Sequence, residues 1–129
     1  MFTLDQIKQA YDKVKTEADF AVYIQELIHL EIKRYDTFIT DGRVVYYGDA
    51  DQVASTDKKY EQLSVAATAN KERFIECLVM HESDQTDYYT FCQHAAQCGI
   101  AKSRIDIIEM TCTYLSAEGD AIVIEKIPV

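Results

Sequence analysis

The residues best suited to chemistry lie in one short stretch, FCQHAAQC at residues 91–98. It holds Cys92, His94 and Cys98, and Cys112 follows in MTCTY. Thiolate and imidazole groups are the usual ligands of zinc in proteins. However, Cys92 and Cys98 are six positions apart, which separates them by about 240° around a helix axis. Structural zinc sites use closer pairs, such as C-x₂₋₄-C, so we expect no metal and no cofactor here.

A reactive thiol is the alternative chemistry for this stretch. Cys92 is the best candidate, because it lies near the start of a predicted helix, and a helix N-terminus lowers the pKa of a thiol. The remaining cysteine is Cys77. We expect all four thiols to be reduced, since the chain begins without a secretory signal and is long enough to form an apolar core.

Other catalytic patterns are weak or missing. His81 and Glu82 are adjacent in VMHESD, but no HExxH metalloprotease motif follows, so we expect a solvated helix end. Asp19 and Asp87 could form a carboxylate pair, although each is also a good helix N-cap residue. We find neither a glycine-rich phosphate loop nor a GxSxG elbow. No catalytic residue is therefore assigned, and an enzyme is the less favoured class.

Tyrosine is the most conspicuous residue type, with nine in the chain. Tyrosine suits half-buried sheet faces, which is the structural interpretation. Exposed aromatic side chains also favour interfaces, which is the functional one. On that basis we predict a binding surface for a ligand or a protein partner that includes Tyr46, Tyr47, Tyr88, Tyr89 and Tyr114.

The chain of 129 residues has a net charge of −9. Division at Val65 leaves both parts acidic, so neither offers a basic surface for a phosphate backbone, and nucleic-acid binding is disfavoured. A cationic protein partner fits this charge better. No apolar run reaches the roughly 18 residues of a membrane span, and we expect one soluble cytoplasmic domain over residues 1–129.

The secondary-structure elements that must position these residues are of two kinds, namely segments with the helical spacing of apolar residues and shorter strand-like runs. Thr3-Leu-Asp-Gln6 is a capping box that opens a helix over 3–16, and Phe2 and Ile7 occupy its staple positions. A second helix is predicted from Asp19 to Glu31. Asp41-Gly42 lies between two strand-like runs and indicates a hairpin with a type I′ turn. A polar loop follows, and YEQLSVA at 60–66 is a candidate third strand.

The same order of elements then recurs. Helical patterns cover 70–83 and 88–98, with Asp87 as an N-cap and Gly99 as the stop. Three strand-like runs follow, namely RIDIIEM, TCTYLS and AIVIEKI. We therefore predict an α+β fold built from an internally duplicated α-α-β-β-β unit. Its sheet is expected to be mostly antiparallel, with the helices packed on one face.

A shift of 68 positions aligns the two predicted halves, about 1–66 and 67–129, without a gap. Five identities support the alignment, namely Asp19/Asp87, Gln25/Gln93, Ile32/Ile100, Ile39/Ile107 and Tyr46/Tyr114. At this offset three cysteines stand opposite aliphatic residues, namely Cys92/Ile24, Cys98/Leu30 and Cys112/Val44. His94 stands opposite Glu26. We therefore expect these cysteines to be buried, unpaired core residues, and His94 to face away from them.

Four segments also resemble a known family, namely ADFAVYIQEL, YDTFITDGRVVYYG, TDYYTFC and MTCTY. The chain is similar from end to end to an uncharacterised family of small bacterial and prophage-associated proteins, some of them labelled "phage envelope protein". The resemblance implies no activity, cofactor or catalytic residue. Members tend to have glycine at the position of Glu31 and an aromatic residue at that of Ser103.

Taken together, these features favour a non-enzymatic cytoplasmic protein that binds a protein partner or a small ligand, with a homodimer plausible. One alternative is a small enzyme that uses Cys92 or a carboxylate pair at the pseudo-two-fold axis. Another is a phage-derived accessory factor that acts on a host protein. The absence of a catalytic constellation and the tyrosine-rich strands favour the binding protein.

Overall fold

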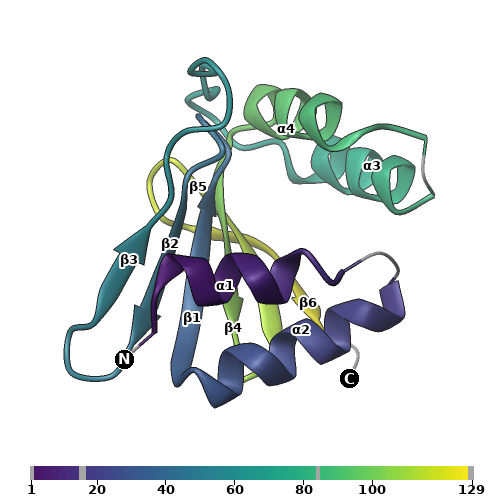
Figure 1. Ribbon diagram of the computed structural model, residues 1–129. Coiled ribbons are helices and arrows are strands. Elements are labelled where there is room, and N and C mark those ends of the chain that lie inside the picture. Colours follow the sequence, from purple (N-terminus) through teal and green to yellow (C-terminus); the bar gives the residue numbers. More distant parts are fainter. Residues whose placement is uncertain (1, 15–16, 84, 128–129) are drawn as a thin grey trace.

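A computed structural model describes residues 2–14, 17–83 and 85–127, and the side chains of 17 and 18 are not included. Four helices and six strands follow in the predicted order (Figure 1). They are α1 (Leu4–Tyr11), α2 (Glu17–His29), β1 (Ile32–Phe38), β2 (Val44–Gly48), β3 (Val53–Ser55), α3 (Lys71–Glu82), α4 (Tyr88–Gln97), β4 (Ile100–Asp106), β5 (Thr111–Ser116) and β6 (Ala121–Lys126). The α+β class is confirmed.

The six strands form one antiparallel sheet in the order β3-β2-β1-β4-β5-β6. The central strands β1 and β4 join the first half of the chain to the second. Hairpin neighbours account for the other pairings, because short connections favour antiparallel strands. The two edges of the sheet are therefore the last strand of each half.

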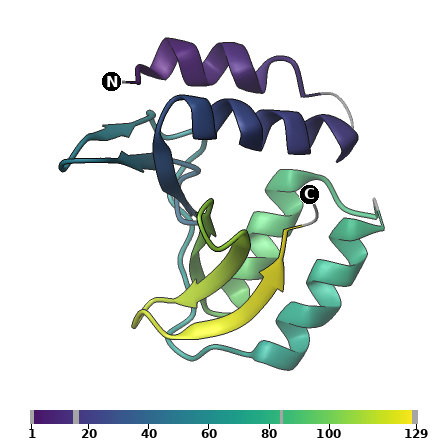
Figure 2. The same ribbon diagram turned by 90° about the horizontal axis from the view of Figure 1, so that it is seen from below.

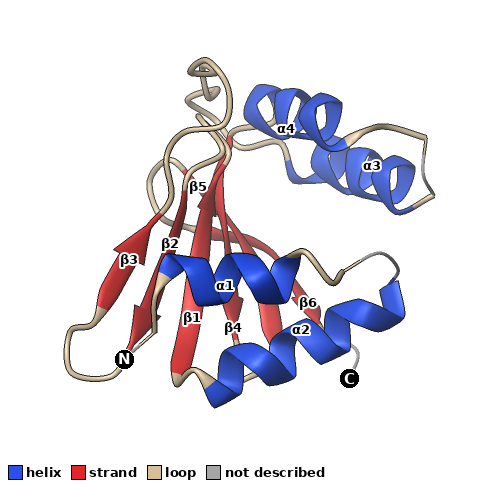
Figure 3. Ribbon diagram, in the orientation of Figure 1, coloured by secondary structure: helices blue, strands red, loops and turns tan. Residues whose placement is uncertain are grey.

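All four helices cover the same face of the sheet (Figures 2 and 3). The helices α1 and α2 pack on a core cluster that includes Tyr35 and Tyr46, while α3 and α4 pack on one that includes Phe74 and Ile100. Tyr114 joins the second cluster. Directly paired strand residues share a face, and so do residues two positions apart, so the registers place both clusters on one side.

The β1–β2 and β4–β5 hairpins have the same register when residue numbers are shifted by 68. Tyr35 on β1 pairs with Tyr46 on β2, and the residues 68 positions later, Ser103 on β4 and Tyr114 on β5, also pair with each other. Each hairpin has an irregularity at the same place, between Ile32/Arg34 and between Ile100/Lys102. Positive φ angles recur as well, at Glu31 and Gly99, Gly42 and Met110, and Asp51 and Gly119. Both halves thus have the same backbone geometry at these points.

Helix caps agree with the sequence in two places and differ in one. The Thr3 side chain accepts the Gln6 N–H and the Gln6 side chain accepts the Thr3 N–H, which confirms the capping box of α1. The Thr90 N–H donates to Asp87 Oδ1 over 2.7 Å, which confirms the cap of α4. Helix α2, however, begins at Glu17, so Asp19 lies inside it and its prediction as an N-cap is wrong. The predicted helical residues 15 and 16 lie outside the described residues.

The prediction of the third strand is also wrong. Strand β3 lies at Val53–Ser55, in the predicted polar loop, whereas 60–66 forms no strand. That segment instead packs against the second core cluster, and the Tyr60 hydroxyl donates to the Ile39 carbonyl over 2.6 Å. The weak alternation of YEQLSVA therefore reflects burial of Leu63 and Val65 beside a helix rather than pairing in a sheet.

The turn between β1 and β2 differs from a type I′ turn. Its connection runs over residues 39–43, and of Asp41 and Gly42 only Gly42 has a positive φ. The Gly42 N–H donates to the Phe38 carbonyl, and the Phe38 N–H donates to the Arg43 carbonyl, each over 2.8 Å. A longer loop therefore closes this hairpin.

The cysteine prediction holds for Cys92 and Cys98, which are buried and unpaired as Cys77 is, whereas Cys112 is only half-buried. His94 is half-buried, and its Nδ1 atom is buried without a partner among the described residues, so it is not fully on the polar surface. His81 is not a solvated helix end, because its half-buried ring stacks on Phe91 with centroids 4.5 Å apart.

Candidate functional site

The face of the sheet opposite the helices carries a set of polar and aromatic side chains. The strand registers place them together, because paired residues of neighbouring strands point to the same side. We call this surface the open face and define it by Arg34, Asp36, Phe38, Arg43, Val45, Tyr47, Lys102, Arg104, Asp106, Thr113, Ile124 and Lys126. No described helix packs on it (Figure 2).

Asp36 lies at the centre of the open face, on the central strand β1, and its side chain is 0% exposed. Arg104 donates to both its carboxylate oxygens, from Nε over 2.8 Å and from Nη2 over 2.9 Å. Lys102 Nζ adds a third contact over 3.2 Å. Burial raises the pKa of this carboxyl, but hydrogen bonds and charge from Arg104 and Lys102 outweigh it, so the pKa lies below its usual value.

Cation–aromatic contacts surround this ion pair. The guanidinium of Arg34 lies 4.4 Å from the ring centroid of Tyr47, and that of Arg43 lies 4.7 Å from Phe38. Lys102 Nζ lies 5.6 Å from the same Phe38 centroid. Within the described residues, neither Arg34 nor Arg43 has a carboxylate partner. Their guanidinium groups therefore keep hydrogen-bonding capacity for a ligand.

The open face differs in charge from the rest of the molecule. It carries five cationic residues and two carboxylates, whereas the whole chain has a net charge of −9. The cations come from strands distant in sequence, and only the antiparallel pairing gathers them. Neither the net charge nor the charge of either half reveals this local excess.

The five tyrosines predicted as a binding surface occupy three different places. Tyr46 is buried in the first core cluster, with its hydroxyl 3.4 Å from that of Tyr23. Tyr114 packs edge-on against Phe74, with ring centroids 4.9 Å apart. The other three lie on the surface: Tyr47 on the open face, and Tyr88 and Tyr89 in the first turn of α4. The structure does not bring the five together.

The thiols lie in surroundings that disfavour their ionised form. Burial raises the pKa of Cys92, and side-chain interactions with Tyr60 and Tyr88 offset this only in part. This direction is opposite to that predicted from the nearby helix N-terminus, because desolvation outweighs the helix dipole at this depth. Burial likewise raises the pKa of Cys112 to about 11. Both thiols are therefore protonated at neutral pH.

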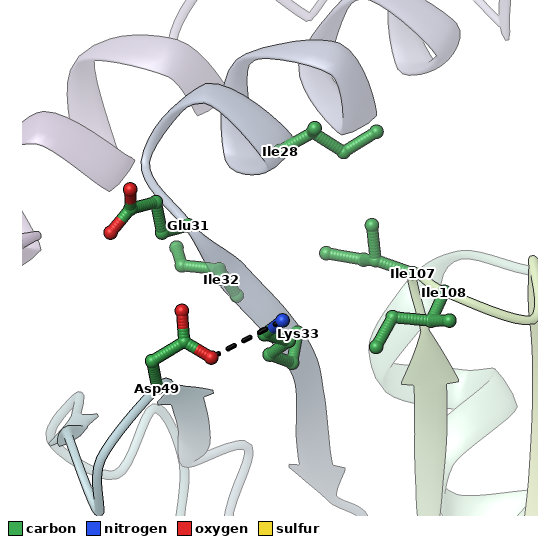
Figure 4. Close-up of a pocket in the computed structure, with 7 residues that line it drawn as sticks. All are labelled: Ile28, Glu31, Ile32, Lys33, Asp49, Ile107 and Ile108. Carbon is green, nitrogen blue, oxygen red and sulfur yellow. Dashed lines mark ion pairs between the residues drawn. The ribbon is translucent and has the colours of Figure 1, made fainter.

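A surface hollow of about 310 Å³ lies where α2 meets the start of β1, beside the turn between β4 and β5 (Figure 4). Four isoleucines form its apolar part and three charged residues its rim, namely Ile28, Ile32, Ile107 and Ile108, with Glu31, Lys33 and Asp49. Lys33 Nζ and Asp49 Oδ1 pair over 3.2 Å along one edge. Glu31 lies on the side of the hollow opposite Ile107 and Ile108, and its carboxylate points away from them (Figure 4).

Sequence reasoning missed both surfaces. A signal for the first was present, because Asp36 and Arg104 are 68 positions apart and so occupy equivalent positions of the predicted repeat. Equivalent residues that pair with each other must lie beside the axis relating the halves. Nothing in the sequence alone showed that β1 pairs with β4, and the hollow depends on that arrangement too.

Two further observations concern the chemistry of the described residues. None of the described helices is long and apolar enough to cross a membrane. Across 2–14, 17–83 and 85–127, no group of three or more histidine, cysteine, aspartate or glutamate side chains has an arrangement that could hold a metal ion.

Comparison with known proteins gives a family without an assigned activity. No curated protein matches the chain. A family model described as "Protein of unknown function (DUF1398)" matches residues 8–126, which include every strand of the sheet and all of the open face. Because this match spans most of the sequence, the chain belongs to the DUF1398 family of proteins of unknown function.

Proposed function

We propose that the protein is a non-enzymatic binding protein, and that its open face binds an acidic segment of a protein partner. The observation that carries this proposal is the local excess of cations on the one sheet face that no described helix covers. Complementary charge speeds encounter and selects among partners. A partner that binds here is thus expected to be acidic, opposite in sign to the partner expected from the net charge.

The side-chain geometry favours carboxylates over nucleic-acid bases. Arg34 and Arg43 lie over Tyr47 and Phe38, so the aromatic faces that could stack on bases are covered by guanidinium groups of the same chain. A guanidinium presents a planar fork of N–H donors that matches a carboxylate.

A fluorescently labelled poly-glutamate peptide is a suitable probe. We expect saturable binding that weakens roughly tenfold when Arg34→Ala and Arg43→Ala are combined, since two charge-assisted contacts are lost. The control combines Lys8→Ala and Lys71→Ala, which removes the same charge from the helical side. Equal losses in both variants would reduce the effect to net charge and overturn the proposal. Tighter binding of single-stranded oligonucleotides would assign the face to nucleic acid instead.

The alternatives from sequence have less support. A thiol enzyme would need an ionisable Cys92, whose pKa is raised by burial. A carboxylate pair would need Asp87, whose Oδ1 instead accepts the Thr90 N–H at the cap of α4. A homodimer, a cytoplasmic location and a phage-derived role on a host protein stay predictions. A homodimer that joins two open faces is disfavoured, because it would bring like charges together.

We also infer that the halves 1–66 and 67–129 are duplicated copies of one unit within a single domain. The shared register of the β1–β2 and β4–β5 hairpins, their matching irregularities and the three pairs of positive φ angles at an offset of 68 support this inference. Convergence on a common burial pattern would explain amphipathic helices, but it gives no reason for positive φ angles to recur at fixed positions.

A further inference from the structure

The second half of the molecule holds a stretch of its own chain in a cradle. The segment Leu63–Asn70, between β3 and α3, contains neither helix nor strand. Its N–H groups donate to three carbonyls, from Leu63 to Thr40 over 2.7 Å, from Ala66 to Ala96 over 2.9 Å and from Asn70 to Cys98 over 2.8 Å. Leu63 and Val65 pack on the second core cluster.

The counterpart of this cradle in the first half is the hollow of Figure 4. At the offset of 68, Ala96 corresponds to Ile28, Gly99 to Glu31 and Ile100 to Ile32. Across the pseudo-two-fold, Ile39 and Thr40 correspond to Ile107 and Ile108. These five counterparts, Ile28, Glu31, Ile32, Ile107 and Ile108, all line the hollow. One half thus has a filled cradle where the other has an open one.

The open cradle also has backbone carbonyl groups that accept no hydrogen bond from the described residues. Within the described residues, no hydrogen bond reaches the carbonyls of Leu30, Ile108 or Glu109. They are the counterparts of acceptors at Cys98, Thr40 and Asp41, each of which binds the Lys59–Asn70 stretch. The Ala96 carbonyl accepts two N–H groups, that of Gly99 over 3.1 Å and that of Ala66 in the segment. Its counterpart, the Ile28 carbonyl, accepts the Glu31 N–H over 2.9 Å and can accept a second donor in the same way.

We propose that the hollow binds an extended aliphatic segment of a partner protein, in the manner in which the second half holds Leu63–Ala67. The segment places two branched aliphatic residues, two positions apart as Leu63 and Val65 are, against the isoleucines. Its N–H groups donate to the carbonyls of Ile108 and Ile28. Lys33 pairs with Asp49 on the rim, which leaves Glu31 there and Glu109 next to Ile108 as the carboxylates without that partner, so a basic residue before the aliphatic pair matches this charge, as Lys59 precedes Leu63.

Glu31 limits how far the bound segment follows the intramolecular one. A Cβ atom on Gly99 would lie 2.7 Å from both the Ala69 Cα and the Thr68 carbonyl oxygen. Glu31 has such a Cβ atom. A segment bound in the hollow therefore cannot follow the backbone path of Leu63–Asn70 beyond the position equivalent to Ala67, because the position equivalent to Thr68 would clash with this Cβ. The contact therefore covers the counterparts of Leu63–Ala67, and replacement of Glu31 by glycine would lengthen it.

The test supplies the chain's own segment as a separate peptide, KYEQLSVAA, which corresponds to residues 59–67. The isotope-labelled full-length protein is titrated with it, and backbone amide shifts are followed by NMR. We expect saturable shifts at Ile28, Glu31 and Ile108. A peptide with aspartate in place of the leucine and valine, or with an N-methyl group at the first alanine, should lose binding, because it lacks the apolar contact or the donor.

Protein variants then locate the contact. Ile108→Asp should weaken binding roughly tenfold, since it removes one aliphatic contact and adds charge to an acidic rim. Ile108 is 66% exposed, so this variant is expected to fold. The matched control is Ile124→Asp on the open face, at a residue that is 64% exposed, and it should leave binding unchanged. Glu31→Gly should tighten binding.

Three results would overturn the proposal. Shifts confined to Thr40, Ala96 and Gly99 would mean that the peptide only replaces the intramolecular segment. Equal losses in the Ile108 and Ile124 variants would mean non-specific adhesion. A dimer that forms without peptide and is broken by Ile108→Asp would assign the hollow to a second copy. Because the open face is a separate surface, none of these results bears on its binding of poly-glutamate.

Discussion

At the scale of single residues, Asp36 is the most unusual side chain among those described. It is fully buried on the sheet face that no helix covers, because the side chains of Arg104 and Lys102 lie over it. Removal of one member of a buried ion pair is more costly than loss of a surface contact, since the remaining charges keep their desolvation cost. Asp36 therefore fixes the arrangement of the cations around it.

This position yields a pH-dependent prediction. Asp36→Asn should lower the free energy of unfolding by about 2 kcal/mol at neutral pH, because its partners are partly exposed and can regain water. The folded-state pKa of Asp36 is depressed, so its contribution is present above the unfolded pKa of about 3.9 and is lost as pH falls through the folded value. Urea unfolding at neutral and acidic pH measures the difference.

The control for this prediction is Asp57→Asn, which removes the same charge from an exposed loop. It should change stability by less than about 0.5 kcal/mol at either pH. A deficit of Asp36→Asn that is as large at acidic pH as at neutral pH would contradict the assignment, since packing rather than ionisation would then be responsible.

Residue types alone point to a metal or thiol site at residues 91–98, which the positions of these side chains do not support. Cys92, His94 and Cys98 drew attention as possible ligands, yet both thiols are buried as the repeat alignment predicted. The alignment worked because burial follows helical position more closely than chemical type. It could not predict the stacking of His81 on Phe91, which depends on how α3 packs against α4.

At the scale of elements, the ends of α2 and α4 have the same backbone geometry with different residues. Glu31 and Gly99 both follow a helix with positive φ, of 65° and 82°. A left-handed conformation is strained for glutamate and unstrained for glycine. The first half therefore carries strain at the mouth of the hollow that the second half lacks.

We predict opposite effects from exchanging these residues. Glu31→Gly should raise the free energy of unfolding by about 1 kcal/mol through relief of this strain. Gly99→Ala should lower it by at least about 2 kcal/mol, because a Cβ would clash with the Thr68–Ala69 backbone in addition to being strained. Thermal or urea unfolding of the single variants provides the measurement.

Gly119→Ala is the matched control, since Gly119 has a φ of +91° but no atom within 4 Å of the added Cβ. It should show the conformational cost alone, about 1 kcal/mol. If Gly99→Ala proves no more harmful than Gly119→Ala, the tight packing of the Leu63–Asn70 segment in its cradle is refuted.

The sequence predicted the order and type of the elements but not all their limits. Strong periodicity and capping residues located the helices, with Thr3 and Asp87 as caps. Strand β3 escaped prediction because it is a three-residue edge strand among polar neighbours, with too few residues for a pattern. The turn at Gly42 depends on contacts with Tyr60 and Lys59, which local sequence does not reveal.

At the scale of the whole molecule, the two halves meet at the pairing of β1 with β4. Under the duplication proposed above, Asp36 pairs with Arg104, its own counterpart, which places the pseudo-two-fold axis between these two residues. Around it Lys102, which contacts Asp36, corresponds to Arg34 on β1. The surroundings of the two central positions are therefore close to interchangeable.

This symmetry predicts the outcome of a charge exchange. Asp36→Arg alone should destabilise the protein by about 3–5 kcal/mol, because it sets two cations against each other in a desolvated position. Addition of Arg104→Asp should restore more than half of the lost free energy of unfolding. In this double variant Arg34 can contact the new aspartate at 104, as Lys102 contacts Asp36 in the original chain. A double-mutant cycle from urea unfolding measures the coupling. Additive losses would show that the central pair does not join the halves as described.

The two candidate binding surfaces are the least predictable part of the molecule. Composition points to the tyrosines, but the structure distributes the five predicted ones between the core, the open face and α4. A surface made of side chains from several strands appears only when strand order and the helix-covered side are both known. The charge of the open face shows this, because its cations are spread along the sequence from Arg34 to Lys126.

The central pairing has a consequence for how such a protein can change over generations. In a dimer of two identical chains, the residue on the axis faces a copy of itself, so aspartate would oppose aspartate and arginine would oppose arginine. Both arrangements are repulsive, so a position on the axis of a symmetric dimer is restricted to residues that can pack against a copy of themselves. Once both halves lie in one chain, each side mutates independently. The Asp36–Arg104 salt bridge, and the uneven charge around it, are therefore not accessible to a symmetric dimer of two identical halves.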